Sequence, residues 1–135
     1  MEAGITRGGC LCGGVRYEVA GPLRDVVACH CSQCRRTSGH FMAATAAPRA
    51  SVRLTASATL RWHASSDTAE RGFCSNCGGN LFWRQRSPAV DSISIAAGTL
   101  DGPVTGLVIR EHIYVADKLD YYAIDDGVPQ HPADR

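Results

Sequence analysis

Seven cysteines in three short groups are the residues of this chain whose type and spacing indicate chemistry. The groups are CLC at 10–12, CHCSQC at 29–34 and CSNC at 74–77. No apolar signal segment follows the first residue, so we expect a cytoplasmic protein, in which thiols stay reduced rather than forming disulfides. An odd number of cysteines also cannot pair completely within one chain. Metal ligation is therefore the predicted chemistry.

The third group, in which Cys74 and Cys77 precede two glycines, is typical of a zinc knuckle, where a tight turn directs two sulfurs toward one ion. Structural zinc takes four ligands, so the knuckle needs two more, either both cysteines of the first group or two of the middle group. The first partition is favoured because it uses all seven cysteines. It leaves the middle group with three protein ligands and one exchangeable position, which is typical of catalytic zinc.

Other interpretations of the cysteines stay open at this point. All seven could serve closed structural sites, with His30 or His40 as an eighth ligand. A thioredoxin-type redox pair is less favoured because no βαβ pattern surrounds either Cys-x2-Cys segment. An iron–sulfur cluster is less favoured because its usual thiolate spacings are not matched.

The elements that must position the cysteines are predicted to be short strands. Alternation of apolar and polar residues, together with strand-forming residue types, predicts strands at 14–20, 59–65, 80–85, 91–98 and 111–117. Glycine and proline pairs predict turns at 8–9, 13–14, 21–22, 78–79, 102–103 and 126–127. One short helix is expected at 32–39. The pattern predicts a mainly β fold of several short antiparallel strands with a zinc knuckle.

Length and charge narrow the class of protein. The chain of 135 residues predicts a single zinc-binding domain over 1–135, with a core at about 8–131 and a loose tail at 132–135. A net charge of +1 without a basic patch argues against a nucleic-acid partner. No apolar run approaches the length of a membrane-spanning helix, so no membrane partner is expected. The oligomeric state stays open, with a homodimer among the alternatives.

Five segments resemble the successive motifs of one protein family. They are GGCLCGGVRYEV, CHCSQCRRTSG, FCSNCGGNLFWR, GTLDGP and HIYVADKLDYYAIDDGVPQ. The motifs are similar to those of the glutathione-dependent formaldehyde-activating enzyme family, which includes the centromere protein V-like proteins. The resemblance implies a β-tent fold and a carbon–sulfur lyase activity that reversibly joins glutathione to formaldehyde as S-hydroxymethylglutathione.

The resemblance also implies two zinc ions per chain, one structural and one catalytic. It assigns the structural zinc to Cys10, Cys12, Cys74 and Cys77, and the catalytic zinc to Cys29, Cys31 and Cys34. Tyr121 stands where the family often has tryptophan, and Val128 where it often has leucine. These two departures bear on the expected substrate rather than on the expected fold, so the identity of the substrate stays open.

Glutathione carries carboxylates, so the catalytic group should have cations beside it. Arg35 and Arg36 are the candidates for binding them, and two solvated surface charges are the alternative. His30 lies between two ligands and is expected to point away from the metal. Phe41 and Trp83 are expected in the core. The alternative to an enzyme is a non-catalytic, zinc-stabilised binding module for a thiol ligand or a protein partner.

Overall fold

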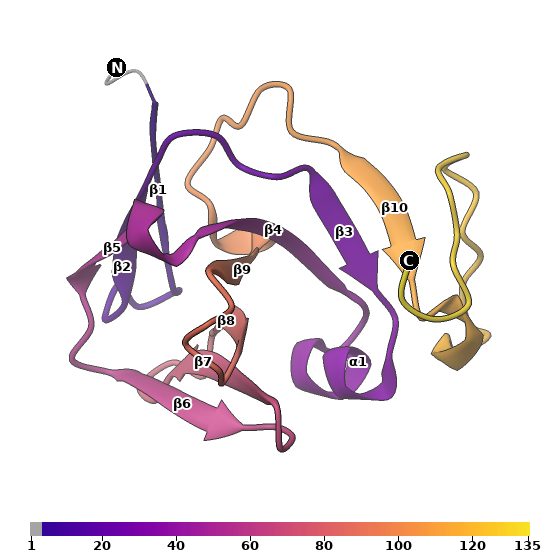
Figure 1. The fold of residues 1–135 in the computed structure, drawn as a ribbon, viewed down its shortest axis with the longest axis horizontal. Coiled ribbons are helices and arrows are strands. Elements are labelled where there is room, and N and C mark those ends of the chain that lie inside the picture. Colours follow the sequence, from indigo (N-terminus) through magenta and orange to yellow (C-terminus); the bar gives the residue numbers. More distant parts are fainter. Residues whose placement is uncertain (1–3) are drawn as a thin grey trace.

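The computed structural model describes residues 4–135 and shows two β-sheets and one short helix (Figure 1). The smaller sheet has the order β1-β2-β5, with β1 at Ile5–Gly9, β2 at Arg16–Ala20 and β5 at Val52–Ala56. The larger sheet has the order β10-β3-β4-β9-β8-β7-β6. Its strands are β3 (Val26–Cys29), β4 (Met42–Pro48), β6 (Leu60–Ala64), β7 (Ala69–Cys74), β8 (Asn80–Gln85), β9 (Ser92–Ala96) and β10 (Ile109–Ile113). The predicted mainly β fold is confirmed.

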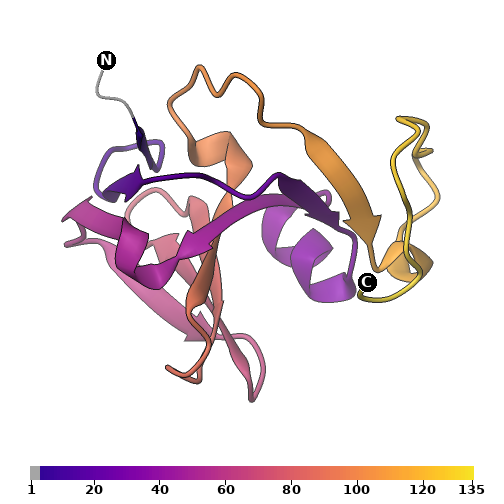
Figure 2. The ribbon, with the colours of Figure 1, turned by 45° about the horizontal axis from the view of Figure 1, so that its top comes forward.

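The helix α1 (Ser32–Ser38) agrees with the predicted short helix at 32–39. Gly39 ends it in the left-handed conformation, at φ 86°, and its N–H donates to the carbonyl of Arg35. Figures 1 and 2 show α1 between the part of the large sheet formed by β3 and β4 and the part formed by β6 to β8. Three 3₁₀ turns complete the described elements: η1 (Arg49–Ser51), η2 (Ala97–Thr99) and η3 (Val115–Asp117).

Strand pairing departs from the expectation in one place. Within residues 4–135 the paired strands are antiparallel except β10 and β3, which run parallel, with Ile113 beside Cys29. The connection from β9 to β10 crosses the molecule over a long loop (Figure 2). The parallel pair brings the end of β10 and the residues that follow it next to the middle cysteine group.

The turn predicted at 8–9 is wrong, because both glycines lie within β1. Gly8 faces Tyr17 across the strand pair. A Cβ on Gly8 would lie 2.3 Å from the Tyr17 hydroxyl and 2.5 Å from the Thr99 carbonyl oxygen. Glycine is required there by the close approach of another side chain, not by a change of chain direction.

The main core lies between the two sheets and contains two of the cysteines. Tyr17 packs edge-on against Phe82 with ring centroids 5.5 Å apart. The buried members of this core are Cys10, Val15, Tyr17, Val19, Ala47, Cys74, Leu81, Phe82, Ile93 and Ile95. A smaller, separate cluster contains Cys34, Met42 and Ala44, with Cys29, Cys31, Trp83 and Ala96 packed against it. The main core thus includes Cys10 and Cys74 of the outer two groups, with Cys77 packed against it and Cys12 exposed, whereas the middle group belongs to the satellite cluster.

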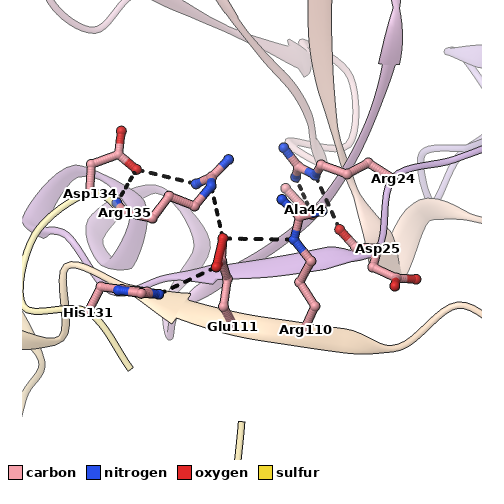
Figure 3. A network of polar contacts seen from close by, with 8 residues as sticks. All are labelled: Arg24, Asp25, Ala44, Arg110, Glu111, His131, Asp134 and Arg135. Carbon is pink, nitrogen blue, oxygen red and sulfur yellow. Dashed lines mark hydrogen bonds and ion pairs between the residues drawn. The ribbon is translucent and has the colours of Figure 1, made fainter. Parts of the chain in front are cut away.

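The last residues of the chain pack along β10, in contrast to the loose tail expected at 132–135. The N–H of Tyr114 donates to the carbonyl of Ala133, at 3.0 Å. The carboxylate of Glu111, which is 13% exposed, lies 2.9 Å from Arg135 and 3.4 Å from His131 (Figure 3). Ion pairs and backbone hydrogen bonds therefore hold this segment, and its composition alone did not indicate them.

Candidate metal centres

The outer cysteines form a four-sulfur cluster. The Sγ atoms of Cys10, Cys12, Cys74 and Cys77 lie within 4.8 Å of one another. Cys12 Sγ is 3.7 Å from Cys10 Sγ and 3.6 Å from Cys74 Sγ. A tetrahedral zinc with Zn–S bonds of about 2.3 Å would set its sulfurs about 3.8 Å apart. The donor atoms therefore fit a zinc ion, and soft thiolates are the ligands that zinc takes in closed sites.

Local backbone geometry places these four sulfurs. Cys10 directly follows β1, and Cys74 ends β7 before a tight turn in which Gly78 adopts a φ of 78°. Neutral donors surround the sulfurs, among them the N–H of Val15, 3.3 Å from Cys10 Sγ. The hydroxyl of Thr59, 3.2 Å from Cys74 Sγ, and nearby backbone N–H groups lower the pKa of Cys74 to about 6. Hydrogen bonds to the thiolate form thus prepare this cluster for a cation.

The middle cysteines form a second cluster of three sulfurs. The Sγ atoms of Cys29, Cys31 and Cys34 also lie within 4.8 Å of one another. Cys29 ends β3, Cys31 is the N-cap of α1, and Cys34 lies in the first turn of that helix. The N–H of Cys34 donates to Cys31 Sγ at 3.3 Å. The strand end and the helix start therefore bring three sulfurs together over six residues.

The protonation of these three sulfurs is shared. Hydrogen bonds with the Cys29 and Cys34 sulfurs lower the pKa of Cys31, whereas hydrogen bonds with the Cys31 and Cys34 sulfurs, together with burial, raise the pKa of Cys29. These opposite shifts favour a state in which, before a cation binds, one of the three cysteines is a thiolate and the other two are thiols. A metal ion that displaces the remaining protons would then hold three thiolates.

Within residues 4–135, the second cluster has no fourth histidine, cysteine, aspartate or glutamate in ligand range. The ring of His30, although it lies between two ligands, is turned to other partners. Its Nδ1 contacts the Tyr122 hydroxyl, and its Nε2 lies 2.9 Å from His112 Nδ1. His40 contacts the Tyr121 hydroxyl. Neither histidine takes the position of an eighth ligand.

A hydrogen-bonded chain links the loop of the second cluster to the C-terminal region. It runs from Tyr122 through His30 and His112 to Asp126, whose carboxylate lies 2.7 Å from His112 Nε2. Burial lowers the pKa of His30 to about 4, and the hydrogen bond from His112 lowers the pKa of Asp126. A neutral His30 and an ionised Asp126 give each link one donor and one acceptor. The chain thus fixes the ring between Cys29 and Cys31.

Aromatic residues surround the second cluster. Trp83 packs against it with Met42. Phe41 lies against the rings of His30 and Tyr122, so it also lines the aromatic surroundings of the loop. Tyr114 has a φ of 56°, a conformation that costs energy for a non-glycine residue. Burial raises the pKa of Tyr114, and the nearby negative charges of Asp134 and of the three-cysteine cluster add to this, so its phenol stays protonated at neutral pH.

Arg35 and Arg36 lie in the last turn of α1. Arg35 is partly buried and Arg36 is exposed. Among the described residues, no carboxylate lies within ion-pair distance of either guanidinium, and the Nε of Arg35 is buried without a hydrogen-bond partner. Both cations therefore remain available to an anionic ligand.

The sequence did not indicate several residues that the fold brings to the second cluster. They are Arg71, Tyr114, Tyr122 and Asp126. Arg71 lies 37 positions from the cysteine that it contacts, and Tyr122 lies 92 positions from His30. The one local signal was the charge of Arg71 itself, in a segment where no strand was predicted.

The fold and the two clusters define a mainly β protein with one four-cysteine and one three-cysteine group that could each hold a metal ion. The family model for the glutathione-dependent formaldehyde-activating enzyme matches residues 5–117. This chain belongs to that family.

Two individual proteins are similar to the chain. A protein of Schizosaccharomyces pombe, named as an uncharacterized lyase, is 35% identical over 77 residues, which are 56% of this chain and 55% of that protein. The chain thus matches about half the length of this relative. A crystal structure of a Rhodobacter sphaeroides protein superposes with a TM-score of 0.59 at 29% identity, covering 76% of this chain and 97% of that one.

Proposed function

We propose that the protein is a zinc-dependent carbon–sulfur lyase that joins a small electrophile such as formaldehyde to the thiol of glutathione, or releases it. Membership of the glutathione-dependent formaldehyde-activating enzyme family supports this proposal, as does the similarity to a protein named as a lyase. The observation that carries it is the second cluster, where three cysteine sulfurs converge without a fourth protein ligand among the described residues. A catalytic zinc site needs such an open position.

The two clusters would each hold one zinc ion with a different role. The cluster of Cys10, Cys12, Cys74 and Cys77 would hold a structural ion, because four ligands close the coordination sphere and two of them lie in the main core. The cluster of Cys29, Cys31 and Cys34 would hold the catalytic ion. Zinc bound there would stabilise a substrate thiol in its nucleophilic thiolate form at neutral pH.

The residues around the second cluster would bind and orient the substrate. Arg35 and Arg36 carry charges that no described carboxylate pairs with, so they would bind the carboxylates of glutathione. Tyr114 keeps its phenolic proton and would donate it in a hydrogen bond to an oxygen beside the cluster. The chain from Asp126 to His30 would hold the ligand loop in one conformation.

The overall reaction is balanced without a further co-reactant. The sulfur of glutathione forms a bond to the carbon of formaldehyde, and the carbonyl oxygen takes up the proton that the thiol loses. Holding the nucleophile and the electrophile in one site replaces a bimolecular encounter by an oriented one. The reverse sequence releases formaldehyde from the adduct.

We also propose a cytoplasmic setting for the protein. All seven cysteines are unpaired in the structure. A reducing cytoplasm would keep them available to metal, and we place the protein there. As a separate observation, no helix within residues 4–135 has the length and apolar character needed to cross a membrane.

Zinc stoichiometry with and without glutathione, followed by an exchange assay, tests the proposal. We expect two zinc ions per chain, and X-ray absorption should show more sulfur ligands per zinc after glutathione is added. Exchange between ¹³C-formaldehyde and its glutathione adduct, followed by NMR, should be faster with the protein than without it. Glutathione binding without faster exchange would instead support the non-catalytic binding module. No change in sulfur coordination would contradict direct binding of the thiol.

A further inference from the structure

Arg71, on β7, is a buried cation beside the three-cysteine cluster. It is 4% exposed, and its Nη2 lies 3.7 Å from Cys34 Sγ. Its Nη1 lies 3.8 Å from the thioether sulfur of Met42, which is a weak acceptor without charge. Its Nε is buried and has no hydrogen-bond partner. Within the part of the chain that the structure describes, no carboxylate lies within ion-pair distance of this guanidinium.

A buried guanidinium in such surroundings is costly. Removing a charged group from water costs several kcal/mol unless a countercharge and hydrogen bonds compensate. Of the contacts that Arg71 makes, only the sulfur of Cys34 can carry a full negative charge. The neighbouring Arg84 on β8 shows the contrast, because its Nε lies 2.7 Å from the carboxylate of Glu70. The position of Arg71 is therefore explained by the charge of the cysteine cluster.

The two cysteine clusters differ in the groups that face their sulfurs. In the four-cysteine cluster the contacts are neutral, such as the N–H of Gly14 at 3.4 Å from Cys12 Sγ and the hydroxyl of Thr59 at Cys74 Sγ. In the three-cysteine cluster a full cation contacts a ligand sulfur. A divalent ion with three thiolates has a charge of −1, and each further thiolate makes it more negative. A fixed positive charge lowers the cost of adding that anion.

We propose that Arg71 is the counter-cation of the Cys29, Cys31 and Cys34 site and that its charge favours the binding of the substrate sulfur as a thiolate. This inference rests on the proposed function, since it requires a metal at that cluster. Arg71 acts on the sulfur of the ligand, whereas Arg35 and Arg36 act on its carboxylates. It is a positioning residue, because its contact is to the ligand Cys34 and not to the reacting atoms.

The test measures thiol binding to protein loaded with Co(II), whose sulfur-to-metal charge-transfer absorption reports the number of bound thiolates. The ligands are glutathione and 2-mercaptoethanol, which has no carboxylate. We expect Arg71→Met to raise the Kd of both thiols by about the same factor, roughly tenfold or more. Arg71→Lys, which keeps the charge, should recover most of the affinity. Arg84→Met serves as the matched control and should leave both dissociation constants unchanged.

Other outcomes separate this inference from the function on which it rests. Unchanged thiol affinity in Arg71→Met, or a change for glutathione alone, would overturn the role of Arg71 and leave the proposed function intact. Wild-type protein that shows no thiol-dependent absorption would count against the open site itself. Retention of the four-cysteine metal and an unchanged far-ultraviolet circular dichroism spectrum would show that the variant is folded. If Arg71→Met does not fold, the comparison of Arg71→Gln with Arg71→Lys tests the same charge.

Discussion

Arg71 and Cys74 lie three positions apart on β7, and their side chains serve different cysteine clusters. Arg71 contacts Cys34 of the open cluster, whereas Cys74 Sγ lies 3.6 Å from Cys12 of the closed one. A register irregularity at Gly72 and Phe73 interrupts the pairing of β7 with β8 between them. Strand β7 therefore contributes side chains to both clusters: Cys74 to the four-cysteine cluster and Arg71 to the surroundings of the three-cysteine cluster.

We expect the loss of metal from the four-cysteine cluster to destabilise the fold more than the loss of metal from the three-cysteine cluster. Cys77→Ser should lower the midpoint of thermal unfolding by roughly 10 °C or more, because four-ligand zinc binding contributes directly to folding. Cys31→Ser should lose one zinc per chain and thiol binding while the protein stays folded, since its cluster lies outside the main core. Zinc stoichiometry and calorimetry measure both effects. Equal destabilisation by the two substitutions would contradict the division into four and three ligands.

We predict that removing the two cations of α1 weakens the binding of glutathione but not that of a thiol without carboxylates. Replacing Arg35 and Arg36 together by glutamine should raise the Kd of glutathione by about 5- to 30-fold, because two charge-assisted contacts to carboxylates are removed. The Kd of 2-mercaptoethanol should change by less than about twofold. Isothermal titration of both thiols measures the difference. Arg61→Gln, on the exposed face of β6, is the control, and an equal loss for the two thiols would argue against carboxylate binding.

The hydrogen-bonded chain behind His30 predicts a remote effect on the open cluster. Asp126→Ala removes the acceptor of His112 Nε2, so His112 and His30 lose their fixed orientation. We expect the unfolding midpoint to fall by a few degrees and the chelator-accessible zinc of the open cluster to be released about 10-fold faster. A chromophoric chelator follows the release. Asp125→Ala, at the neighbouring position, is the control, and matching release rates in the two variants would contradict a role for the chain.

We predict that the fold loses stability at alkaline pH because the buried Tyr17 must ionise there. Its hydroxyl donates to Thr99 Oγ1 at 2.7 Å, because Thr99 Oγ1 itself donates to the Ala96 carbonyl. Burial raises the pKa of Tyr17 to about 12, whereas an unfolded tyrosine titrates near 10. The folded protein thus keeps this proton over a pH range in which the unfolded chain loses it. The stabilisation of the fold by the protonated Tyr17 is complete below pH 10 and is lost, by about 3 kcal/mol in all, as the pH rises through 12.

Urea unfolding of the zinc-loaded protein at several pH values measures this contribution. Other groups also titrate in that range, so the comparison is between the wild type and Tyr17→Phe. The difference in the free energy of unfolding between the two should shrink, and then change sign, as the pH increases. A difference that stays constant from pH 9 to pH 12 would show that the folded-state pKa of Tyr17 is not raised.

The sequence predicted the elements whose local pattern matches their environment. Strand β8 coincides with the predicted 80–85, and α1 agrees with the short helix expected at 32–39. Strand β4 was missed because its buried residues are mostly alanines, which give no clear alternation of large apolar side chains. Strand β10 was expected to continue to 117, but Tyr114 adopts a left-handed conformation and ends it.

The candidate metal sites show a similar division. Spacing left two partitions of the cysteines open. The division into four and three was favoured because it uses all seven and because the family resemblance implies it, and the sulfurs gather in those two groups. The side chains that tune the open cluster could not be found in this way. Arg71 and Asp126 reach it through contacts that depend on the pairing of β7 with β8 and of β10 with β3. Such pairings are fixed by the whole fold.

The position of Cys31 as the N-cap of α1 gives the protein an internal reporter of metal occupancy. The sulfur that would hold the ion also accepts the hydrogen bond from the Cys34 N–H at the start of the helix. A bound cation withdraws electron density from that sulfur and restrains its position, so the exchange of the Cys34 amide hydrogen with solvent should differ between the loaded and the empty cluster. Hydrogen–deuterium exchange at this one amide would therefore follow the metal occupancy of the three-cysteine cluster without any added probe.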